Sequence, residues 1–264
     1  MELDAAAKAA LDPSRPNVAR VWDYWLGGKN HFAADREQAE RMWQVFPRAG
    51  QLARENRQFL DRAVSYVAGQ GIRQFIDVGA GLPTVLNTHE IAQREAPSSK
   101  VAYVDNDPVV VRHAEALLAT HPSVIALRGD ARDPLEILSD PGLLGLVDLA
   151  APVCVVLCAV LHFLDAGAAS KTATAFVRAI APGSYVIMSV GTGEDPDVIR
   201  RFEAEYQAAR LHSFSLAEFT GFFDGLTVVP PGLLPAQDWR ADEAAGRREP
   251  PIGYFLVGVG RKEA

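Results

Sequence analysis

The hydrophobic positions of the chain follow a helical period over its first 70 or so residues. In the stretch "NVARVWDYWLGG", apolar residues recur at the spacing of one helix face, which predicts a helix over residues 18–26 that ends at a glycine pair. Asp35 and Gln38 have the spacing of a capping box and predict that a second helix opens there. A third helix is predicted over residues 52–68. The chain therefore begins with helices alone.

Beyond this region, short apolar runs alternate with stretches of helical pattern. The runs predict five strands, at residues 74–79, 101–105, 124–129, 153–159 and 184–190. Aspartates typical of helix N-caps follow or separate them, at Asp107, Asp133, Asp165 and Asp195. Repeated strand–helix units predict an α/β fold, a parallel sheet with helices on both faces. Two closing strands, near 226–231 and 253–262, predict a hairpin at the sheet edge, with a Pro- and Gly-rich insertion at about 230–252 between them.

Composition and charge narrow the classes of function. The 264 residues, 48% hydrophobic and 22% charged, predict one main globular domain. A formal net charge of -7 argues against a nucleic-acid partner. The sequence shows neither a membrane span nor a signal peptide, so we expect no membrane association and a cytoplasmic location, while a homo-oligomer stays open. Cys154 and Cys158 are expected to be small buried hydrophobes rather than a disulfide or a metal site.

The loop Gly79-Ala80-Gly81, directly after the first strand, is the first candidate for ligand binding. Open parallel sheets bind ligands where loops leave the carboxyl ends of the strands. A dinucleotide fingerprint would place a third glycine where Thr84 stands, and Pro83 removes one amide from the loop. The run from Asp77 to Gly81 instead resembles motif I of the class I methyltransferases that use S-adenosylmethionine. That resemblance implies a cofactor without a diphosphate.

Acidic residues follow the next two strands. Asp105, with Asn106 beside it, ends the second strand, where an acidic side chain is expected to accept the ribose hydroxyls of an adenosine ligand. NAD enzymes also meet this requirement. Asp107 is interpreted as a helix N-cap. Asp130 follows the third strand, where class I methyltransferases bind the adenine amino group; the resemblance gives Ala131 the amide for a ring nitrogen. The alternative is that Asp130 only ties a turn.

The segment after the fourth strand, "CAVLHFLD", resembles the part of small-molecule methyltransferases that lines the donor site and the acceptor pocket. The resemblance makes Ala159 a cofactor-binding candidate. His162 is the obvious chemical candidate, and the alternative is a structural histidine satisfied by backbone at a helix start.

Longer stretches of the chain resemble one bacterial family. They are "SRPNVARVWDYWLGGKNHFAADRE", "ARENRQFLDRAVSYVAGQGIRQFIDVGAGLPT", "NTHEIAQ", "VAYVDNDPVVVRHAEALL" and the final "VVPPGLLPAQDWR". The family is largely actinobacterial, was long catalogued as a domain of unknown function, and was later labelled S-adenosyl methyltransferase. The resemblance implies a class I methyltransferase (Rossmann-like) fold with a seven-stranded sheet of order 3-2-1-4-5-7-6, strand 7 antiparallel. It implies S-adenosylmethionine as cofactor and names no acceptor.

The N-terminal helices are expected to form a lid. We predict a tail and helical lid over residues 1–50 and a donor-binding methyltransferase domain over 51–264. The segment "DYWLGGKNHF" carries Tyr24 and His31 beside a glycine pair, and we expect it to fold over donor and acceptor and exclude water. The alternative is ordinary packing with solvated polar groups. Three residues of the third helix are candidates for binding the donor's carboxylate: Arg54, Asn56 and Arg57.

The predicted function is that of an S-adenosylmethionine-dependent methyltransferase acting on an unidentified small molecule. A sulfonium is already a good leaving group, so alignment of the reactants supplies most of the rate. For a hydroxyl acceptor a base helps, and His162 is the first candidate, followed by His31 and Tyr24. No metal site is predicted, because the acidic residues near the site are allotted to the loop and to adenosine.

Two other functions stay open on the sequence alone. An NAD-dependent oxidoreductase is favoured by the glycine loop and Asp105 and disfavoured by Pro83, Thr84 and Asp130. A non-catalytic protein could bind the donor and regulate a partner through its Trp-rich N-terminal helix.

Overall fold

A computed structural model describes residues 12–84, 86–193, 195–241 and 253–263. The predicted tail up to residue 11 and much of the predicted insertion at about 230–252 lie outside the described residues. Among the described residues, one sheet contains eight strands. They are β1 (Gln74–Val78), β2 (Lys100–Asp105), β3 (Val124–Arg128), β4 (Cys154–Cys158), β5 (Tyr185–Gly193), β6 (Thr227–Val228), β7 (Leu234–Pro235) and β8 (Gly253–Arg261).

The strand order is β3-β2-β1-β4-β5-β8-β6, with the two-residue β7 pairing β8 off this path. The strands β1 to β5 pair in parallel, whereas β8 runs antiparallel to β5 and to β6. This confirms the predicted order, with β8 in the place of the seventh strand. The closing strands do pair as predicted, but β8 lies inside the sheet between β5 and β6, so only β6 is at the edge.

The parallel register brings four loops to one edge of the sheet. Asp77 of β1 pairs with Tyr103 of β2, and Asp105 at the end of β2 pairs with Arg128 at the end of β3. The loops that follow β1, β2, β3 and β4 therefore leave the sheet together. This is the edge at which ligands bind in open parallel sheets.

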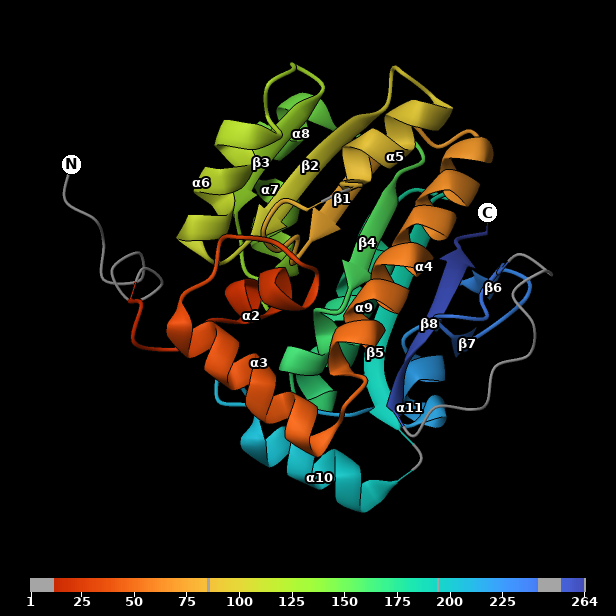
Figure 1. Cartoon of the computed structure of the whole chain (residues 1–264). Helices are drawn as coiled ribbons and strands as arrows, with labels where there is room; N and C mark the ends of the chain where they lie inside the picture. The colour runs from red at the N-terminus through yellow and green to blue at the C-terminus, as the bar shows by residue number, and fades with distance from the viewer. Residues whose placement is uncertain (1–11, 85, 194, 242–252, 264) are drawn as a thin grey trace.

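Helices cover both faces of the sheet (Figure 1). On one face, α4 (Ala49–Gly69) and α5 (Thr88–Glu95) pack on the strands with part of α6 (Pro108–Leu117). On the other lie α7 (Pro134–Ser139), α8 (Pro141–Leu146), α9 (Ala166–Ala179) and α11 (Leu216–Gly221). Two fully buried apolar cores result, one under each layer. The helix α8 was not predicted; Asp140 begins it by accepting hydrogen bonds from the amides of Gly142 and Leu143.

Three further helices lie at the carboxyl edge of the sheet. These are α2 (Val18–Trp25), α3 (Ala33–Val45) and α10 (Pro196–Glu205), and Figure 1 shows α2 at the ends of β1 and β4 and α3 beside α10. The Gln38 side chain fixes the last pair by donating to the Glu205 carbonyl at 2.9 Å. The predicted domain boundary at residue 50 falls inside α4, which begins at Ala49.

The predicted capping box at Asp35 and Gln38 was wrong. The helix α3 begins at Ala33, and Asp35 is already in its first turn, where its carboxylate accepts from the Phe32 amide at 2.7 Å. Gln38 is buried against α10 instead of capping. The helix begins before the predicted cap. Phe32, the residue before the helix, has no side-chain group that could cap it, so Asp35 does the capping from inside the helix.

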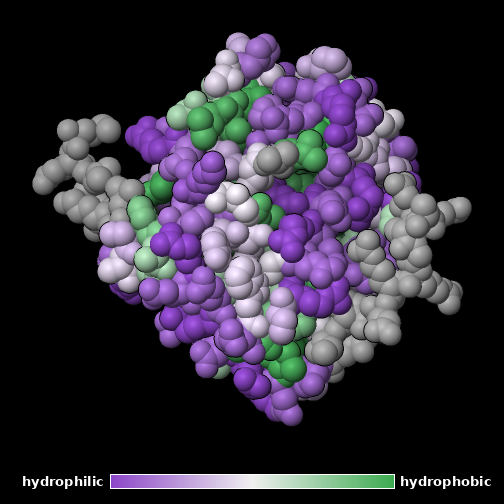
Figure 2. Space-filling view, in the orientation of Figure 1, coloured by the Kyte–Doolittle hydropathy of each residue, from purple (hydrophilic) through white to green (hydrophobic). Residues whose placement is uncertain are grey.

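The face of the molecule in Figure 2 is mostly hydrophilic, with hydrophobic residues in small separate groups. In the described part of the chain, no helix combines the length and the apolar character that crossing a bilayer requires.

Candidate functional site

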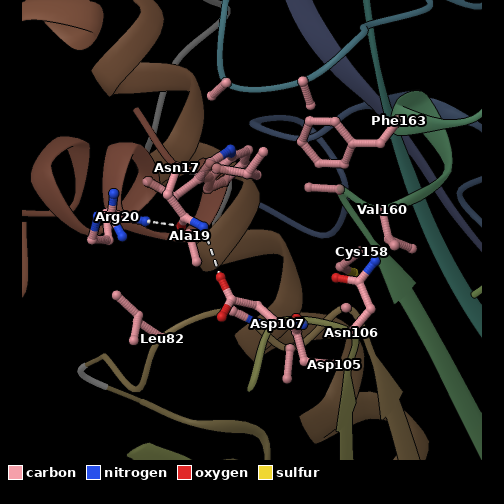
Figure 3. Close-up of a pocket in the computed structure, with 18 of the residues that line it drawn as sticks. Asn17, Ala19, Arg20, Leu82, Asp105, Asn106, Asp107, Cys158, Val160 and Phe163 are labelled. Carbon is pink, nitrogen blue, oxygen red and sulfur yellow. Dashed lines mark hydrogen bonds between the residues drawn. The ribbon is translucent and has the colours of Figure 1, made fainter. Parts of the chain in front are cut away.

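A cavity of about 570 Å³ opens at the carboxyl edge of the sheet. Its walls come from the loops after β1, β2, β3 and β4, from residues 15–20 with parts of α2 and α4, and from residues 207–209 (Figure 3). This volume lies within the roughly 300–1,000 Å³ typical of small-molecule sites. We call it the donor cavity, because the cofactor-binding residues predicted at the strand ends lie on its wall: Asp77, Gly79, Ala80, Gly81, Asp105, Asn106, Asp130, Ala131 and Ala159.

The glycine loop of the donor cavity has no free amides for a phosphate. Gly79 and Gly81 have φ angles of 73° and 68°, a region that favours glycine. The Gly79 and Ala80 amides donate to the Val104 carbonyl at 2.8 and 3.3 Å, and the Gly81 amide donates to Asp105 Oδ2 at 2.9 Å. A dinucleotide loop would aim such amides at a diphosphate.

The start of α5 is likewise occupied. It begins at Thr88, well beyond the loop, and the carboxylate of Glu90 accepts the Asn87 amide at 2.7 Å. Glu90 therefore already supplies negative charge at the start of this helix. Both features favour a ligand without a diphosphate.

Asp105 lies at the centre of the cavity floor. Its Oδ2 accepts the Gly81 amide and its Oδ1 accepts the Asp107 amide, each at 2.9 Å. Burial raises the pKa of Asp105 to about 6, with Asp107 and Asp77 adding like charge nearby. Two ionised oxygens offer about four acceptor sites, so capacity for hydroxyl donors remains. Asp107 caps α6 through the Val109 amide at 2.7 Å, which confirms its predicted role.

Asp130 lies on the cavity wall beside Arg132 and Asn106. The Arg132 amide and Nε both donate to its Oδ1 at 2.9 Å, its guanidinium also bonds Oδ2, and Asn106 Nδ2 donates to Oδ2 at 3.3 Å. These bonds lower the pKa of Asp130 to about 2. Ala131, next in the chain, is buried and its carbonyl accepts from Thr172 Oγ1 at 3.0 Å. Asp133 precedes α7, but its side chain makes no capping bond, contrary to expectation.

Asp77 is buried beneath the glycine loop. Its carboxylate accepts from Thr88 Oγ1 at 2.6 Å, and burial raises its pKa, opposed by that bond and by the positive charge of Arg57. Arg57 and Asn56 line the donor cavity from α4, and Asn56 Oδ1 is buried without a hydrogen-bond partner among the described residues. Arg54 does not line this cavity; it donates to the Trp25 carbonyl at 3.1 Å.

The segment after β4 divides between two cavities. Ala159 has a φ of 56°, and its amide donates to Ser189 Oγ at 2.8 Å on the wall of the donor cavity. His162, in the 3₁₀ helix η1 (Leu161–Phe163), is buried and lines a second, smaller cavity. Its Nδ1 has no hydrogen-bond partner in the described part of the chain, and burial lowers its pKa to about 3. His162 is therefore neutral at physiological pH and a weak base.

The other two catalytic candidates lie away from both cavities. The Tyr24 hydroxyl donates to Glu40 at 3.3 Å, and its ring meets the His31 ring edge to face with centroids 4.9 Å apart. His31 Nδ1 contacts the Arg36 guanidinium at 3.2 Å. The predicted segment thus contributes only Asp23 and Leu26 to the donor cavity.

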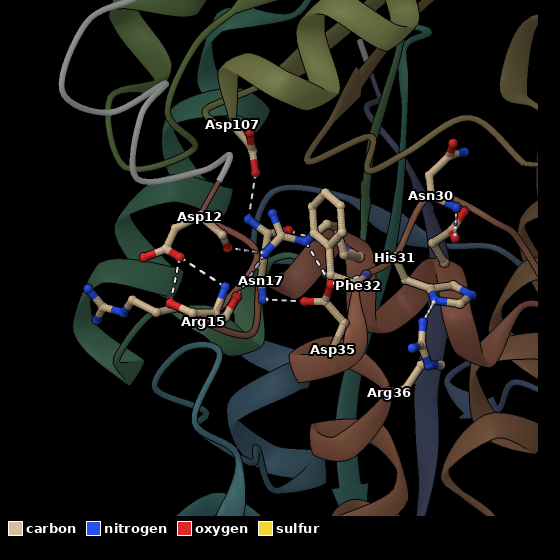
Figure 4. A network of polar contacts seen from close by, with 12 residues as sticks. Asp12, Arg15, Asn17, Asn30, His31, Phe32, Asp35, Arg36 and Asp107 are labelled. Atoms are coloured by element: carbon tan, nitrogen blue, oxygen red, sulfur yellow. Dashed lines mark hydrogen bonds and ion pairs between the residues drawn. The ribbon is translucent and has the colours of Figure 1, made fainter.

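Residues 15–20, which the sequence did not single out, cover the donor cavity instead. Asn17 begins α2, accepting the Arg20 amide, and its Nδ2 donates to Asp107 Oδ2 at 2.7 Å across the cavity mouth (Figure 3). Asp35 holds the segment from behind: it accepts the Asn17 amide at 2.9 Å and pairs with Arg20 Nε at 2.8 Å (Figure 4). Arg20 and Asp35 are both buried. An Asn before a predicted helix was the available signal.

Cys158 also departs from expectation. It is half-buried and lines the donor cavity, whereas Cys154 is fully buried as predicted, and both are free thiols. Among the described residues, no three His, Cys, Asp or Glu side chains gather in a way that could hold a metal ion.

Comparisons with known proteins agree with this geometry. Residues 4–263 match the family described as S-adenosyl methyltransferase. A crystal structure of a candidate methyltransferase from Thermobifida fusca superposes with a TM-score of 0.92 at 35% identity, covering 99% of this chain and 100% of that one. A DUF574 family protein from Streptomyces avermitilis gives 0.89 at 38% identity, covering 95% and 99%. A search of the curated proteins gives no match.

More distant structures share the fold. The N-methyltransferase NodS from Bradyrhizobium japonicum, crystallised with S-adenosyl-L-homocysteine, gives a TM-score of 0.50 at 13% identity, covering 93% of this chain and all of that one. The match over nearly the whole length settles the family. The chain belongs to the S-adenosyl methyltransferase family and is an S-adenosylmethionine-dependent methyltransferase.

Proposed function

We propose that this methyltransferase holds its donor in the donor cavity and methylates a small-molecule acceptor. The observation that carries the proposal is the position of Asp105 and Asp130 on neighbouring strand ends of one cavity, beside a loop whose amides are already bonded within the chain. Such a cavity suits adenosine and offers no seat for a diphosphate. The residues present therefore fit S-adenosylmethionine better than NAD.

We assign each part of the donor to the residues of one wall of the cavity. Asp105, with Asn106 beside it, accepts the ribose hydroxyls, and Asp130 with the Ala131 amide binds the adenine. Asn56 and Arg57 bind the amino-acid end of the donor. The buried Asn56 Oδ1 is an acceptor without a hydrogen-bond donor among the described residues, and the ammonium of the methyl donor supplies one. The Arg57 guanidinium suits the carboxylate.

The chain's own contribution to catalysis is alignment and exclusion of water. When bound, S-adenosylmethionine supplies a methyl group on a sulfonium that is already a good leaving group. Residues 15–20 close the donor cavity, and positioning of the reactants supplies most of the acceleration. With a pKa near 3, His162 is poorly matched to general-base work at neutral pH, so we assign it acceptor binding through a hydrogen bond. Tyr24 and His31 receive no role while they lie outside the cavities.

The acceptor class belongs to the same proposal. A net charge of -7 opposes binding of a polyanion, which supports a small molecule over a nucleic acid.

Calorimetric titration with S-adenosyl-L-homocysteine and, separately, with NAD tests the proposal. We expect binding of the former to weaken at least tenfold in Asp105→Asn and Arg57→Ala, with no NAD binding to either variant or the parent. Asp197→Asn, an exposed carboxylate on α10, is the matched control. Binding of NAD alone would overturn the assignment.

A further inference from the structure

A second cavity, of about 100 Å³, lies beside the donor cavity. Trp22 and Phe163 line both, so the two spaces share part of a wall. The smaller one is enclosed by α2, α4, η1, α10 and the ends of β5 and β8. We call it the aromatic cavity, because many of its lining residues carry rings, among them Trp22, Trp25, His162, Phe163, Tyr206 and Phe255.

The rings of the aromatic cavity pack on one another in stacked, tilted and edge-on pairs. His162 packs on Phe163 with centroids 4.4 Å apart, and Phe163 and Trp25 each stack on Tyr206 at 6.5 and 6.4 Å. Trp22 meets Phe255 edge to face at 5.8 Å. Aromatic rings attract further aromatic rings in stacked and edge-on geometries at these separations. The walls therefore suit a flat guest.

Three buried polar atoms of this cavity have no hydrogen-bond partner among the described residues: Trp25 Nε1, His162 Nδ1 and Tyr206 Oη. Each belongs to a side chain that is more than nine-tenths buried. Leaving such atoms unpaired is costly, and most buried polar groups in folded proteins are paired. An indole N–H can only donate, while a hydroxyl and a neutral imidazole can donate or accept. A guest that bonds to these atoms therefore needs polar groups that can both donate and accept.

The charge of the lining residues and the size of the aromatic cavity further limit the compounds that it can bind. Among the residues described as lining the aromatic cavity, none is Asp, Glu, Lys or Arg, and burial keeps His162 neutral by lowering its pKa to about 3. A charged guest would find no counter-ion there. An engineered apolar cavity of about 150 Å³ holds benzene, so about 100 Å³ admits one ring after slight relaxation and excludes fused rings.

We propose that the aromatic cavity is the acceptor pocket and takes a neutral, single-ring aromatic compound bearing a hydroxyl or amino group. The proposal rests on the proposed function, since it requires the donor to occupy the neighbouring cavity. Trp25, His162 and Tyr206 bind the polar group of the ring, and the shared residues Trp22 and Phe163 place the ring next to the donor.

Phenol is the probe, titrated by ligand-observed NMR into protein saturated with S-adenosyl-L-homocysteine; benzoate is the charged probe of the same ring. We expect millimolar phenol binding and at least tenfold weaker benzoate binding. Tyr206→Phe should weaken phenol binding about three- to tenfold, while thermal stability is unchanged or raised, because the variant removes an unpaired hydroxyl. Ala53→Leu, which fills the cavity from α4, should abolish phenol binding.

The matched control is Tyr66→Phe, since Tyr66 packs on Tyr185 and Trp239 and lines neither cavity. It should leave phenol binding unchanged. Phenol binding that Tyr206→Phe and Ala53→Leu both leave intact would overturn the proposal, as would absence of phenol binding or equal affinity for benzoate. Titration with S-adenosyl-L-homocysteine on the same samples separates this result from failure of the donor assignment.

Discussion

At the scale of single residues, the donor cavity holds two carboxylates whose environments act in opposite directions. Burial raises the pKa of Asp105 to about 6, whereas the bonds from Arg132 lower the pKa of Asp130 to about 2. Asp130 is therefore ionised throughout the physiological range. Asp105 loses its charge a little below neutrality, so the proposed role of Asp105 predicts that donor binding is sensitive to pH.

Donor affinity should fall as the pH drops through 6. Ribose hydroxyls donate to ionised Asp105, and protonation removes an acceptor, so we expect binding of S-adenosyl-L-homocysteine to weaken about tenfold between pH 7 and pH 5. Calorimetry over this range measures the change and the accompanying proton release, because the donor binds the ionised carboxylate. Asp105→Asn should bind weakly with little pH dependence. An equally steep pH profile in that variant would contradict the assignment.

The two glycines of the loop should differ in tolerance to substitution. Both have positive φ, which costs an L-residue about 1–2 kcal/mol. A Cβ on Gly81 would meet no atom within 4 Å, whereas one on Gly79 would lie 2.6 Å from the Val160 side chain. Gly81→Ala should therefore lose about 1–2 kcal/mol of unfolding free energy, and Gly79→Ala roughly 1–3 kcal/mol more from overpacking. Urea denaturation decides the order, and equal losses would refute the steric argument.

At the scale of elements, the N-terminal segment is a wall of the donor cavity fixed at two points. Asp35 anchors it through Arg20 and the Asn17 amide, and the Asn17 side chain reaches the far side of the cavity mouth at Asp107. The anchor is buried and strong, whereas the contact to Asp107 is a single partly buried bond. Opening should therefore begin at Asn17.

Asn17→Ser tests that contact. Serine keeps the N-cap of α2 but is too short to reach Asp107, so the free energy of unfolding should fall by about 0.5–1.5 kcal/mol, the value of one hydrogen bond. Dissociation of S-adenosyl-L-homocysteine, followed by stopped flow, should accelerate about fivefold, the value of one lost hydrogen bond. Asn17→Ala, which loses the cap as well, should destabilise the protein by about 1 kcal/mol more. An unchanged dissociation rate in Asn17→Ser would rule out the closing role.

The sequence predicted the helices and strands better than it predicted the side-chain contacts between them. The strands and the positions of Asp105 and Asp130 at their ends follow from local patterns, namely apolar runs with acidic residues after them, whereas the strand order was implied by the family resemblance. The bonds that tie Asn17 to Asp107 and Asp35 to Arg20 span long or unpatterned separations, and no period in the sequence reports them. His162 was found by type, but the cavity it lines is built from helices far apart in the chain.

At the scale of the whole molecule, Asp105 and His162 have opposite effects on the free energy of unfolding as the pH falls. The pKa of Asp105 is raised from 3.8 to about 6, so between these values the folded state takes up a proton first and gains stability as pH falls. The pKa of His162 is lowered from 6.5 to about 3, so the unfolded state takes up a proton first and the folded state loses stability as pH falls. The two effects nearly cancel between pH 4 and pH 6.

A variant that lacks one of these two side chains should show the pH dependence of stability that the other side chain causes. Relative to the parent, Asp105→Asn should lose stability on acidification from pH 6 to pH 4 by about 1.4 kcal/mol per pH unit, and His162→Gln should gain by the same slope. Urea unfolding at pH 4.5 and pH 6 gives both slopes directly. Parallel curves for parent and variants would show that neither carboxyl nor imidazole titrates as the structure indicates.

The rings of Trp22 and Phe163 belong to two compartments at once, and this has a thermodynamic consequence. Any shift of these rings that one guest favours alters the room left for the other. Linkage then requires reciprocity: whatever factor the methyl donor adds to acceptor affinity, the acceptor must return to the donor. The donor that has lost its methyl group contacts the same wall differently, so it would then affect how fast both products dissociate.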